Sequence, residues 1–232
     1  MSGANELDYM KINFELTKDL AVAAKSAGIK HFIYLSTAHV YGDSGSLVEH
    51  SHEYNEESSC TVQDPYGRSK ILAENFLKKI ESADFIVSII RSPMIYGKSG
   101  KSNLLNLLKL IQVCPVLPFA FTQNRRSLIY IKNLTYFLRL VIEKKVAGVL
   151  LPQDERAISI YELVSYLAKS AGKRVFLFKL PSNLQKTLNI FFKTQAIRLF
   201  GTLAFDSRRS NQLTGYYPIV STEEAILETF SE

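Results

Sequence analysis

Hydrophobic positions in this chain follow two patterns, short apolar runs and longer segments in which apolar residues recur every three or four positions. Short apolar runs are typical of strands buried on both faces, and they occur near 30–36, 85–91, 147–151 and 175–179. The longer recurrence is typical of amphipathic helices, and it occurs at about 7–27, 66–82, 102–112, 132–144, 159–171, 183–199 and 221–230. Because helices separate the first three strands, the pattern favours a parallel α/β sheet. The stretch Ser44–Ser59 fits neither pattern and is predicted to be a surface loop.

Length and composition indicate one globular unit. The chain has 232 residues, of which 47% are hydrophobic and 22% charged, so it can bury a sizeable core. The start, from Met1 to Asn13, is polar and acidic, unlike a signal peptide, and no apolar run approaches the ~20 residues that cross a bilayer. Cys60 and Cys114 fit neither a metal-binding spacing nor a disulfide scaffold. We therefore expect a cytoplasmic protein with no metal site.

The net charge of +6 is dispersed along the chain, with several pairs of basic residues in place of one block. A nucleic-acid-binding protein usually concentrates such residues on one face, so nucleic acid is not an expected partner. A mild positive balance suits a ligand that carries two phosphates. The basic and apolar segment Leu184–Phe205 has two interpretations, a helix on a membrane surface or a helix that caps a ligand site. We favour the cap and do not expect membrane contact.

Two short segments carry candidate chemistry. Ser36 and Thr37 end the first predicted strand, and strand ends in doubly wound folds hold reactive groups. Tyr66 and Lys70 are four residues apart in the helix that follows Asp64, a favourable N-cap, so they project from one face roughly 5–6 Å apart. At an effective dielectric of about 20, the ammonium would favour the phenolate by roughly 3 kcal/mol and lower the pKa of Tyr66 by about two units. These residues predict a site that oxidises an alcohol, with the phenol as general base.

The strand ends in the run Leu-Ser-Thr-Ala-His-Val-Tyr-Gly, and the helix begins with Pro-Tyr-Gly-Arg-Ser-Lys. Together these runs resemble the extended short-chain dehydrogenase/reductase family, and more narrowly its NAD-dependent nucleotide-sugar epimerases, dehydratases and reductases. The resemblance implies a Rossmann-like doubly wound parallel sheet with a small C-terminal substrate-binding subdomain. It also implies that Tyr66 takes a proton from a sugar hydroxyl, Lys70 binds the nicotinamide ribose, Thr37 holds the reacting oxygen and Ser36 lies beside the cofactor.

Further segments resemble the same family, and each implies a role. The first predicted helix carries Asn13 where the family has an Asn that supports the active site, and the resemblance implies that Asn13 is among the substrate-binding residues. The segment 89–97 resembles the strand and loop that pass over the nicotinamide and the sugar, which places Pro93 at the cofactor. Asn103 and Arg126 stand where the family holds the substrate diphosphate, a role suited to a helix N-terminus and a forked guanidinium. A plain helix cap for Asn103 and a solvated surface charge for Arg126 remain open.

Two departures from the family bear on the substrate. Its dehydratases carry Asp-Glu directly after the Thr, where this chain has Ala38 and His39, so a dehydratase is not expected. His39 has no evident paired carboxylate in the sequence and is interpreted as structural. The Arg-Arg-x-Gly-Asp run with which many epimerases hold the diphosphate does not occur. The resemblance thus implies a C4 epimerase or a 4-keto reductase for a UDP-sugar, with UDP-N-acetylhexosamines among the candidates.

The family also begins with a Gly-x-x-Gly-x-x-Gly turn that cradles the cofactor phosphates, and the sequence has no such turn. Gly42 and Gly45 do not replace it, because no helix is predicted directly after them. We therefore expect NAD or NADP to bind weakly. An alternative hypothesis is a truncated, catalytically inactive family member, or a remnant that keeps only the sugar-nucleotide site.

The absence of the glycine-rich turn also bears on how copies of the chain associate. The strand near 30–36 is expected to have an unpaired edge, which favours association. In the family the helices corresponding to 7–27 and 66–82 form the dimer interface, so we expect a homodimer through them, with apolar outward faces. We predict a single domain, with its core mainly at 1–100 and 127–151 and its substrate-binding cap mainly at 101–126 and 152–232.

Overall fold

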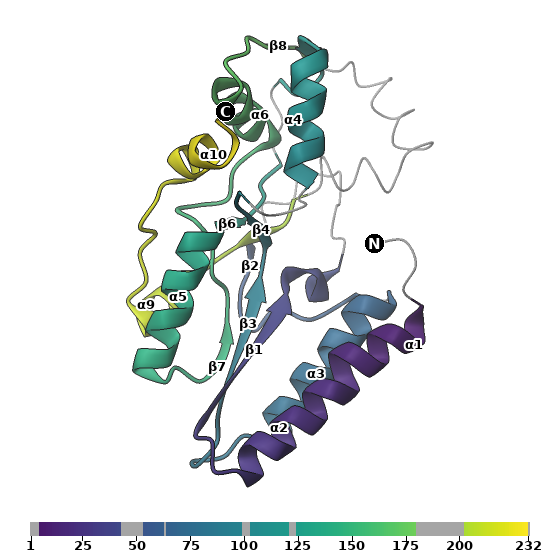
Figure 1. The fold of residues 1–232 in the computed structure, drawn as a ribbon, viewed down its shortest axis with the longest axis vertical. Helices are drawn as coiled ribbons and strands as arrows, with labels where there is room; N and C mark the ends of the chain where they lie inside the picture. The colour runs from purple at the N-terminus through teal and green to yellow at the C-terminus, as the bar shows by residue number, and fades with distance from the viewer. Residues whose placement is uncertain are drawn as a thin grey trace.

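Three parallel strands form the centre of the fold in the computed structural model (Figure 1). They are β1 (His31–Thr37), β3 (Ile86–Ser92) and β7 (Gly148–Leu150), and they lie in the order β1-β3-β7. β1 and β3 pair in register from His31 opposite Ile86 to Thr37 opposite Ser92. This sheet confirms the predicted parallel α/β class. The structure describes residues 5–42, 53–62, 64–98, 103–120, 124–179 and 202–231.

Helices cover both faces of the sheet, as a doubly wound fold requires (Figure 1). On one side lie α1 (Glu6–Tyr9), a π-helical turn (Met10–Glu15), α2 (Leu16–Ser26) and α3 (Pro65–Ile80), and on the other lie α5 (Ile131–Lys144) and α9 (Arg208–Thr214). Side chains of β3 alternate between the two layers. Ile89 packs with Ala73 and Leu77 of α3, whereas Ile90 packs with Phe137 and Val141 of α5.

A second apolar cluster lies among the helices of the predicted cap. Leu107 of α4, Val164 of α6 and Ile226 of α10 belong to it, together with Leu128 and Tyr130, which were predicted to belong to the core. The cap therefore packs directly onto the sheet region. The elements around this cluster are α4 (Asn103–Val113), β4 (Met94–Tyr96), β5 (Val116–Leu117), β6 (Leu128–Tyr130), α6 (Ile160–Ser170), β8 (Phe176–Leu177) and α10 (Thr222–Phe230).

The predicted helices within the described ranges are present, with ends shifted by a few residues. The strand predicted at 175–179 is shortened to β8. The predicted loop Ser44–Ser59 is partly wrong, because Glu53–Tyr54 forms a strand, β2, that pairs with β9 (Ala204–Phe205). The rest of that loop up to residue 52, and the helix predicted at 183–199, lie outside the described residues. Within the described ranges, no helix combines the length and the apolar character needed to cross a bilayer.

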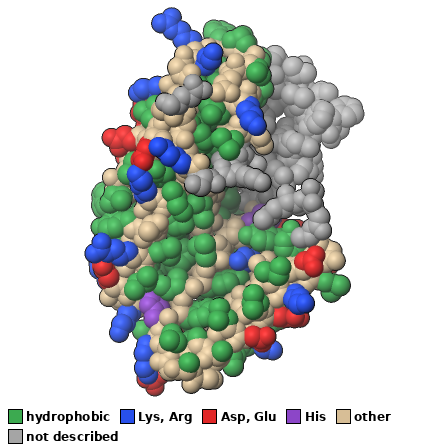
Figure 2. Space-filling view, viewed as in Figure 1, with side chains coloured by type: hydrophobic (Ala, Val, Ile, Leu, Met, Phe, Trp, Pro, Cys, Tyr) green, Lys and Arg blue, Asp and Glu red, His purple; other side chains and the backbone are tan. Residues whose placement is uncertain are grey.

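Exposed apolar side chains lie along the outer surface from α1 to α2, as predicted, with charged side chains among them (Figure 2). Leu7, Ile12, Leu16 and Leu20 are each more than half exposed, and Leu72 of α3 is 41% exposed. Among the strands of the described residues, β1 pairs with β3 alone, so its other edge has no strand partner there. Both features agree with the expectation of association, while the homodimer itself stays a prediction.

Candidate active site

The carboxyl end of β1 turns sharply after Thr37. The next four residues, Ala38–Tyr41, form a 3-10 turn, and the Thr37 hydroxyl oxygen accepts a hydrogen bond from the backbone N–H of His39 at 3.2 Å. Gly42 ends the turn with a φ of +89°, and a Cβ there would lie 2.9 Å from the Thr61 hydroxyl oxygen. Only glycine takes this conformation at little cost. The turn holds Thr37 half-buried at the end of the strand.

The start of α3 is fixed by its first residues. Asp64 is the N-cap, its Oδ1 accepts a hydrogen bond from the Gly67 N–H at 3.1 Å, and Pro65 follows at the first helical position. Such a start is favourable, because the carboxylate satisfies a free N–H and proline lacks one. A Cβ on Gly67 would lie 2.4 Å from Cγ1 of Val62. Glycine therefore lets α3 approach the preceding segment and sets the position of Tyr66.

Tyr66 and Thr37 meet in the structure, as predicted from the sequence. The Thr37 hydroxyl lies close enough to the phenol to affect its pKa, and the ring of Tyr9 packs edge-on against the Tyr66 ring with centroids 5.6 Å apart. Burial raises the pKa of Tyr66, the Thr37 hydroxyl opposes this, and the negative charge of Asp64 adds to it. The phenol is therefore held in its protonated form at neutral pH.

Lys70 lies one turn after Tyr66 on α3, but its ammonium has other partners. Nζ donates to the Leu35 carbonyl oxygen at 3.1 Å and lies 4.8 Å from the centre of the Tyr34 ring. Burial lowers the pKa of Lys70, and the nearby Glu74 opposes that change. The pKa of Tyr66 is thus raised by burial, whereas the sequence predicted that Lys70 would lower it. Spacing alone gave the proximity of the two residues, but burial decides the acidity of the phenol.

Ser36 points to the opposite face of β1 from Thr37, because neighbouring strand residues alternate. Its hydroxyl donates to Oε1 of Glu74 at 2.6 Å. Glu74 in turn accepts from Arg91 at 2.7 Å, and Arg91 also donates to the Tyr41 hydroxyl at 2.9 Å. All four residues are buried. Ser36 thus belongs to a buried polar network between β1 and α3. This placement does not support the cofactor role predicted for it.

Asn13 lies beside the helix that carries Tyr66. Its Nδ2 donates to the Ser69 hydroxyl oxygen at 3.0 Å, and that hydroxyl donates to the Tyr66 carbonyl oxygen at 2.7 Å. The backbone carbonyl of Asn13 also accepts from the Tyr34 hydroxyl at 3.4 Å. Asn13 therefore links the π-helical turn to α3 and β1. This arrangement agrees with the supporting role that the sequence predicted.

The remaining predicted residues lie on other segments. Pro93 is buried between β3 and β4. Asn103 begins α4, but its side chain lies outside the described residues. Arg126 is half-buried, its N–H donates to the Ile158 carbonyl at 2.8 Å, and its own backbone also pairs with Leu203. The structure thus fixes the backbone around Arg126 from two sides.

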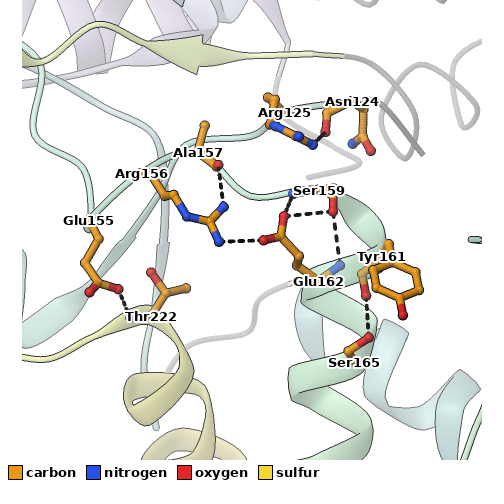
Figure 3. Close-up of polar contacts among 10 residues, drawn as sticks. All are labelled: Asn124, Arg125, Glu155, Arg156, Ala157, Ser159, Tyr161, Glu162, Ser165 and Thr222. Atoms are coloured by element: carbon orange, nitrogen blue, oxygen red, sulfur yellow. Dashed lines mark hydrogen bonds and ion pairs between the residues drawn. The ribbon is translucent and has the colours of Figure 1, made fainter. Parts of the chain in front are cut away.

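The neighbouring segment is tied to the start of α6, because the Ile160 N–H donates to Oδ1 of Asn124 at 3.1 Å. Figure 3 shows the polar contacts around this helix start. Arg125 donates to the Asn124 carbonyl oxygen at 3.1 Å. Ser159 and Glu162 form a capping box, in which each side chain satisfies a backbone N–H of the other residue. Burial raises the pKa of Glu162, but hydrogen bonds from Arg156 and Ser159 outweigh this and lower it to about 2. The carboxylate therefore stays charged and keeps this part of the cap in place.

Sequence reasoning missed a pair beside Tyr66. Nε2 of His39 lies 2.6 Å from Oδ2 of Asp64, and the His39 and Tyr66 ring centroids are 6.0 Å apart. His39 was predicted to lack a paired carboxylate, and that prediction is wrong. The residue that could have indicated this pair is Asp64. Its role as the N-cap of the helix already accounted for its presence, so no second partner was sought for it. Among the described residues, no cluster of three or more His, Cys, Asp or Glu could hold a metal ion.

The structure therefore brings Thr37, His39, Asp64, Tyr66 and Lys70 to one strand end and the adjoining helix start. A protonated phenol beside a hydroxyl can exchange a proton with a substrate oxygen that both groups contact. The ammonium, anchored on a strand carbonyl, supplies a positive charge one helical turn away. This set suits the interconversion of an alcohol and a carbonyl.

Comparisons with known proteins identify the family of the chain. The model of the NAD dependent epimerase/dehydratase family matches residues 2–151. A UDP-glucose 4-epimerase of Vibrio cholerae is 32% identical over 227 residues, which are 95% of this chain and 68% of that protein. A dTDP-D-glucose 4,6-dehydratase of Mus musculus is 38% identical over 98 residues, which are 42% of this chain and 26% of that protein.

Solved structures share the fold. A UDP-glucuronic acid 4-epimerase from Bacillus cereus, determined in complex with NAD, is 21% identical and superimposes with a TM-score of 0.74. The superposition covers 98% of this chain and 67% of that one. With the family match over more than half of its length, the chain belongs to the NAD-dependent epimerase/dehydratase family.

Proposed function

We propose that this protein is a nucleotide-sugar C4 epimerase or 4-keto reductase in which Thr37, Tyr66 and Lys70 act on a UDP-sugar. The observation that carries this proposal is that the Thr37 hydroxyl and the Tyr66 phenol lie close together at the carboxyl end of β1, with Lys70 one turn further along α3. The Vibrio cholerae relative, a UDP-glucose 4-epimerase by name, supports the same substrate class.

The residues after Thr37 argue against a dehydratase. Eliminating water from a sugar needs an acid and a base, and the family's dehydratases carry Asp-Glu at these positions. This chain has Ala38, which cannot transfer a proton, and His39, which is bonded to Asp64. Epimerisation and keto reduction need only the exchange of one proton at the reacting oxygen, which Tyr66 supplies.

Tyr66 is the proton donor and acceptor in this proposal. Because its pKa is raised, the phenol carries a proton at neutral pH and donates it to a keto oxygen held by the Thr37 hydroxyl. In the reverse direction the phenolate takes the proton back from the sugar hydroxyl. Asn13, through Ser69, holds the backbone of Tyr66 during both steps.

The donor set around Lys70 fits the nicotinamide ribose of NAD. An ammonium and a phenol lie one helical turn apart on α3, and ribose hydroxyls can accept hydrogen bonds from such donors. NAD, when bound, supplies the hydride acceptor and donor. Lys70 would hold the ribose, and buried Pro93 would form part of the wall beside it. The Bacillus cereus neighbour, determined with NAD, supports this cofactor.

Arg126 and Asn103 are proposed to hold the substrate diphosphate. The backbone of Arg126 is fixed by Ile158 and Leu203, so its guanidinium starts from a rigid position and its fork suits phosphate oxygens. Asn103 opens α4, and a helix N-terminus favours an anion.

The test is the variant Tyr66→Phe. The substitution removes only the phenol hydroxyl, so it should lower turnover between UDP-glucose and UDP-galactose about 10²- to 10⁴-fold, the usual contribution of a positioned acid or base. Turnover is measured by chromatography of the nucleotide sugars with NAD supplied, and reduction of a UDP-4-keto sugar is measured with NADH. Tyr217→Phe is the matched control, because Tyr217 is 83% exposed. Unchanged turnover in Tyr66→Phe contradicts the proposal.

A further inference from the structure

The contact between His39 and Asp64 is the feature of this site that the proposed reaction does not use. Nε2 of His39 and Oδ2 of Asp64 are 2.6 Å apart, and the two side chains are 30% and 42% exposed. We propose that His39 and Asp64 act as one positioning pair, which holds Thr37 and Tyr66 together and balances the charge beside the phenol. This inference rests on the function proposed above.

The pair closes a ring of contacts around the phenol. Oδ1 of Asp64 accepts from the Gly67 N–H at the start of α3, while Oδ2 faces His39. The backbone N–H of His39 donates to the hydroxyl oxygen of Thr37, and the Thr37 hydroxyl lies close enough to the Tyr66 phenol to lower its pKa. The two carboxylate oxygens of Asp64 therefore contact different elements. Oδ1 binds the start of α3, and Oδ2 binds the turn after β1.

Helix capping alone does not require His39. Ser, Thr or Asn caps a helix as well as Asp does, and none of them brings a negative charge. Here the charge matters, because Asp64 opposes ionisation of Tyr66. An imidazole that donates to Oδ2 draws part of that negative charge away from the phenol. The other groups that face Tyr66 are Thr37 of β1 and Tyr9 of the first helix, and Lys70 follows one turn later on α3.

This arrangement predicts opposite effects for its two members. His39→Ala leaves the carboxylate without its partner, so the pKa of Tyr66 rises. Asp64→Asn keeps an oxygen for the Gly67 N–H but removes the charge, so the pKa of Tyr66 falls. We expect each change to be up to about one pH unit, since the pair is partly exposed to solvent. A residue that only supports the fold does not produce two shifts of opposite sign.

The experiment titrates the phenol by ultraviolet difference spectroscopy in the full chain, with Tyr66→Phe subtracted as the blank. His39→Gln, whose amide can still donate to Asp64, should restore most of the wild-type titration. Ser221→Ala, which removes the N-cap of α10, is the control for a lost helix cap and should leave the titration unchanged. Thermal unfolding of each variant shows that it is folded.

Kinetics supply the second measurement. His39→Ala should lower kcat about tenfold with little change in KM, and His39→Gln should recover most of it. Equal titration curves for wild type, His39→Ala and Asp64→Asn overturn the positioning pair, whatever their activities. Full turnover in Tyr66→Phe overturns the proposed function instead, and the titration still decides the pair, so the two failures are distinguishable.

Discussion

Arg91 and Glu74 form an ion pair that is almost completely removed from solvent, with side chains 3% and 1% exposed. Two guanidinium nitrogens reach the carboxylate, and Ser36 and Tyr41 satisfy further positions. Burial raises the pKa of Tyr41 to about 12, although Arg91 opposes this. The network is therefore neutral as a whole and fully hydrogen-bonded, which is the condition for keeping charges inside a protein.

Removing one partner of this pair should be costly. Arg91→Met or Glu74→Gln leaves a buried charge without its counter-charge, and we expect a loss of about 3–5 kcal/mol in the free energy of unfolding. The measurement is urea unfolding followed by circular dichroism. Arg139→Met is the control, since its pair with Glu143 is mostly exposed and should contribute little to the free energy of unfolding. Equal losses in both pairs would contradict the burial argument.

At the scale of residues, the sequence predicted contacts that follow from local spacing. Thr37 and Tyr66 could be placed because a strand end and a helix start each have a recognisable pattern. The pKa of Tyr66 could not be predicted in this way. It depends on how deeply the rest of the fold buries the phenol, and burial outweighs the charge of Lys70. His39 was misjudged for the same reason, since its partner lies on another segment and already had a sufficient explanation as a helix cap.

Helices α1 and α2 present an apolar outer surface. Ile12, Leu16 and Leu20 recur at intervals of four residues and are 62%, 61% and 57% exposed. Four-residue spacing places them in one row along the helix. A row of this kind beside Leu72 is suited to a second copy of the chain, in agreement with the dimer predicted from the family resemblance.

Placing charges in this row should therefore weaken the association. Leu16→Lys together with Leu20→Lys is expected to raise the dimer dissociation constant at least about tenfold, a change of roughly 1.4 kcal/mol. Sedimentation velocity over a range of concentrations measures it. Ile142→Lys, on the far side of the sheet and 56% exposed, should have no effect. A wild-type chain that stays monomeric at every concentration rules out this interface.

At the scale of elements, long segments were predictable and short ones were not. The periodic patterns located α3, α5 and α6, because each buries a full apolar face. Strands of two or three residues, such as β2 and β4, have no periodicity to detect. Their positions depend on partners elsewhere in the chain, so tertiary pairing creates them.

For the whole molecule, the proposal divides the ligand contacts between two regions. Tyr66, Lys70 and Pro93 lie near the sheet, and Arg126 lies where Ile158 and Leu203 meet. The residues assigned to NAD reach its nicotinamide half only, so we expect weaker binding of NAD than of UDP-glucose. Calorimetry measures both affinities directly.

Titration with UDP-glucose and, separately, with NAD should separate the two regions. Arg126→Ala is expected to weaken UDP-glucose binding about tenfold or more, since a charged hydrogen bond is worth roughly 1.5–3 kcal/mol, and to leave NAD binding unchanged. Arg139→Ala is the matched control. Heat with UDP-glucose but none with NAD would favour the inactive, sugar-nucleotide-binding alternative. Equal binding of UDP-glucose by wild type and Arg126→Ala would refute the role of Arg126.

The fold class followed from the order of strands and helices, whereas the packing of the cap did not. Leu128 and Tyr130, assigned to the core from their place in the sequence, also belong to the apolar cluster of α4, α6 and α10. Such sharing arises because a small cap cannot bury its helices alone. A division by residue number therefore describes this molecule less well than a division by packing.

Helix α3 has one further consequence. Its sixteen residues carry the phenol and the ammonium toward the strand end, Glu74 into the interior, and Leu72 toward the outside. A helix moves as a rigid rod, so a displacement at one of these surfaces is felt at the other two. If copies of the chain pair as predicted, thermodynamic linkage makes the relation reciprocal: a sugar nucleotide that shifts α3 would change the affinity between copies by the same factor as pairing would change its own affinity.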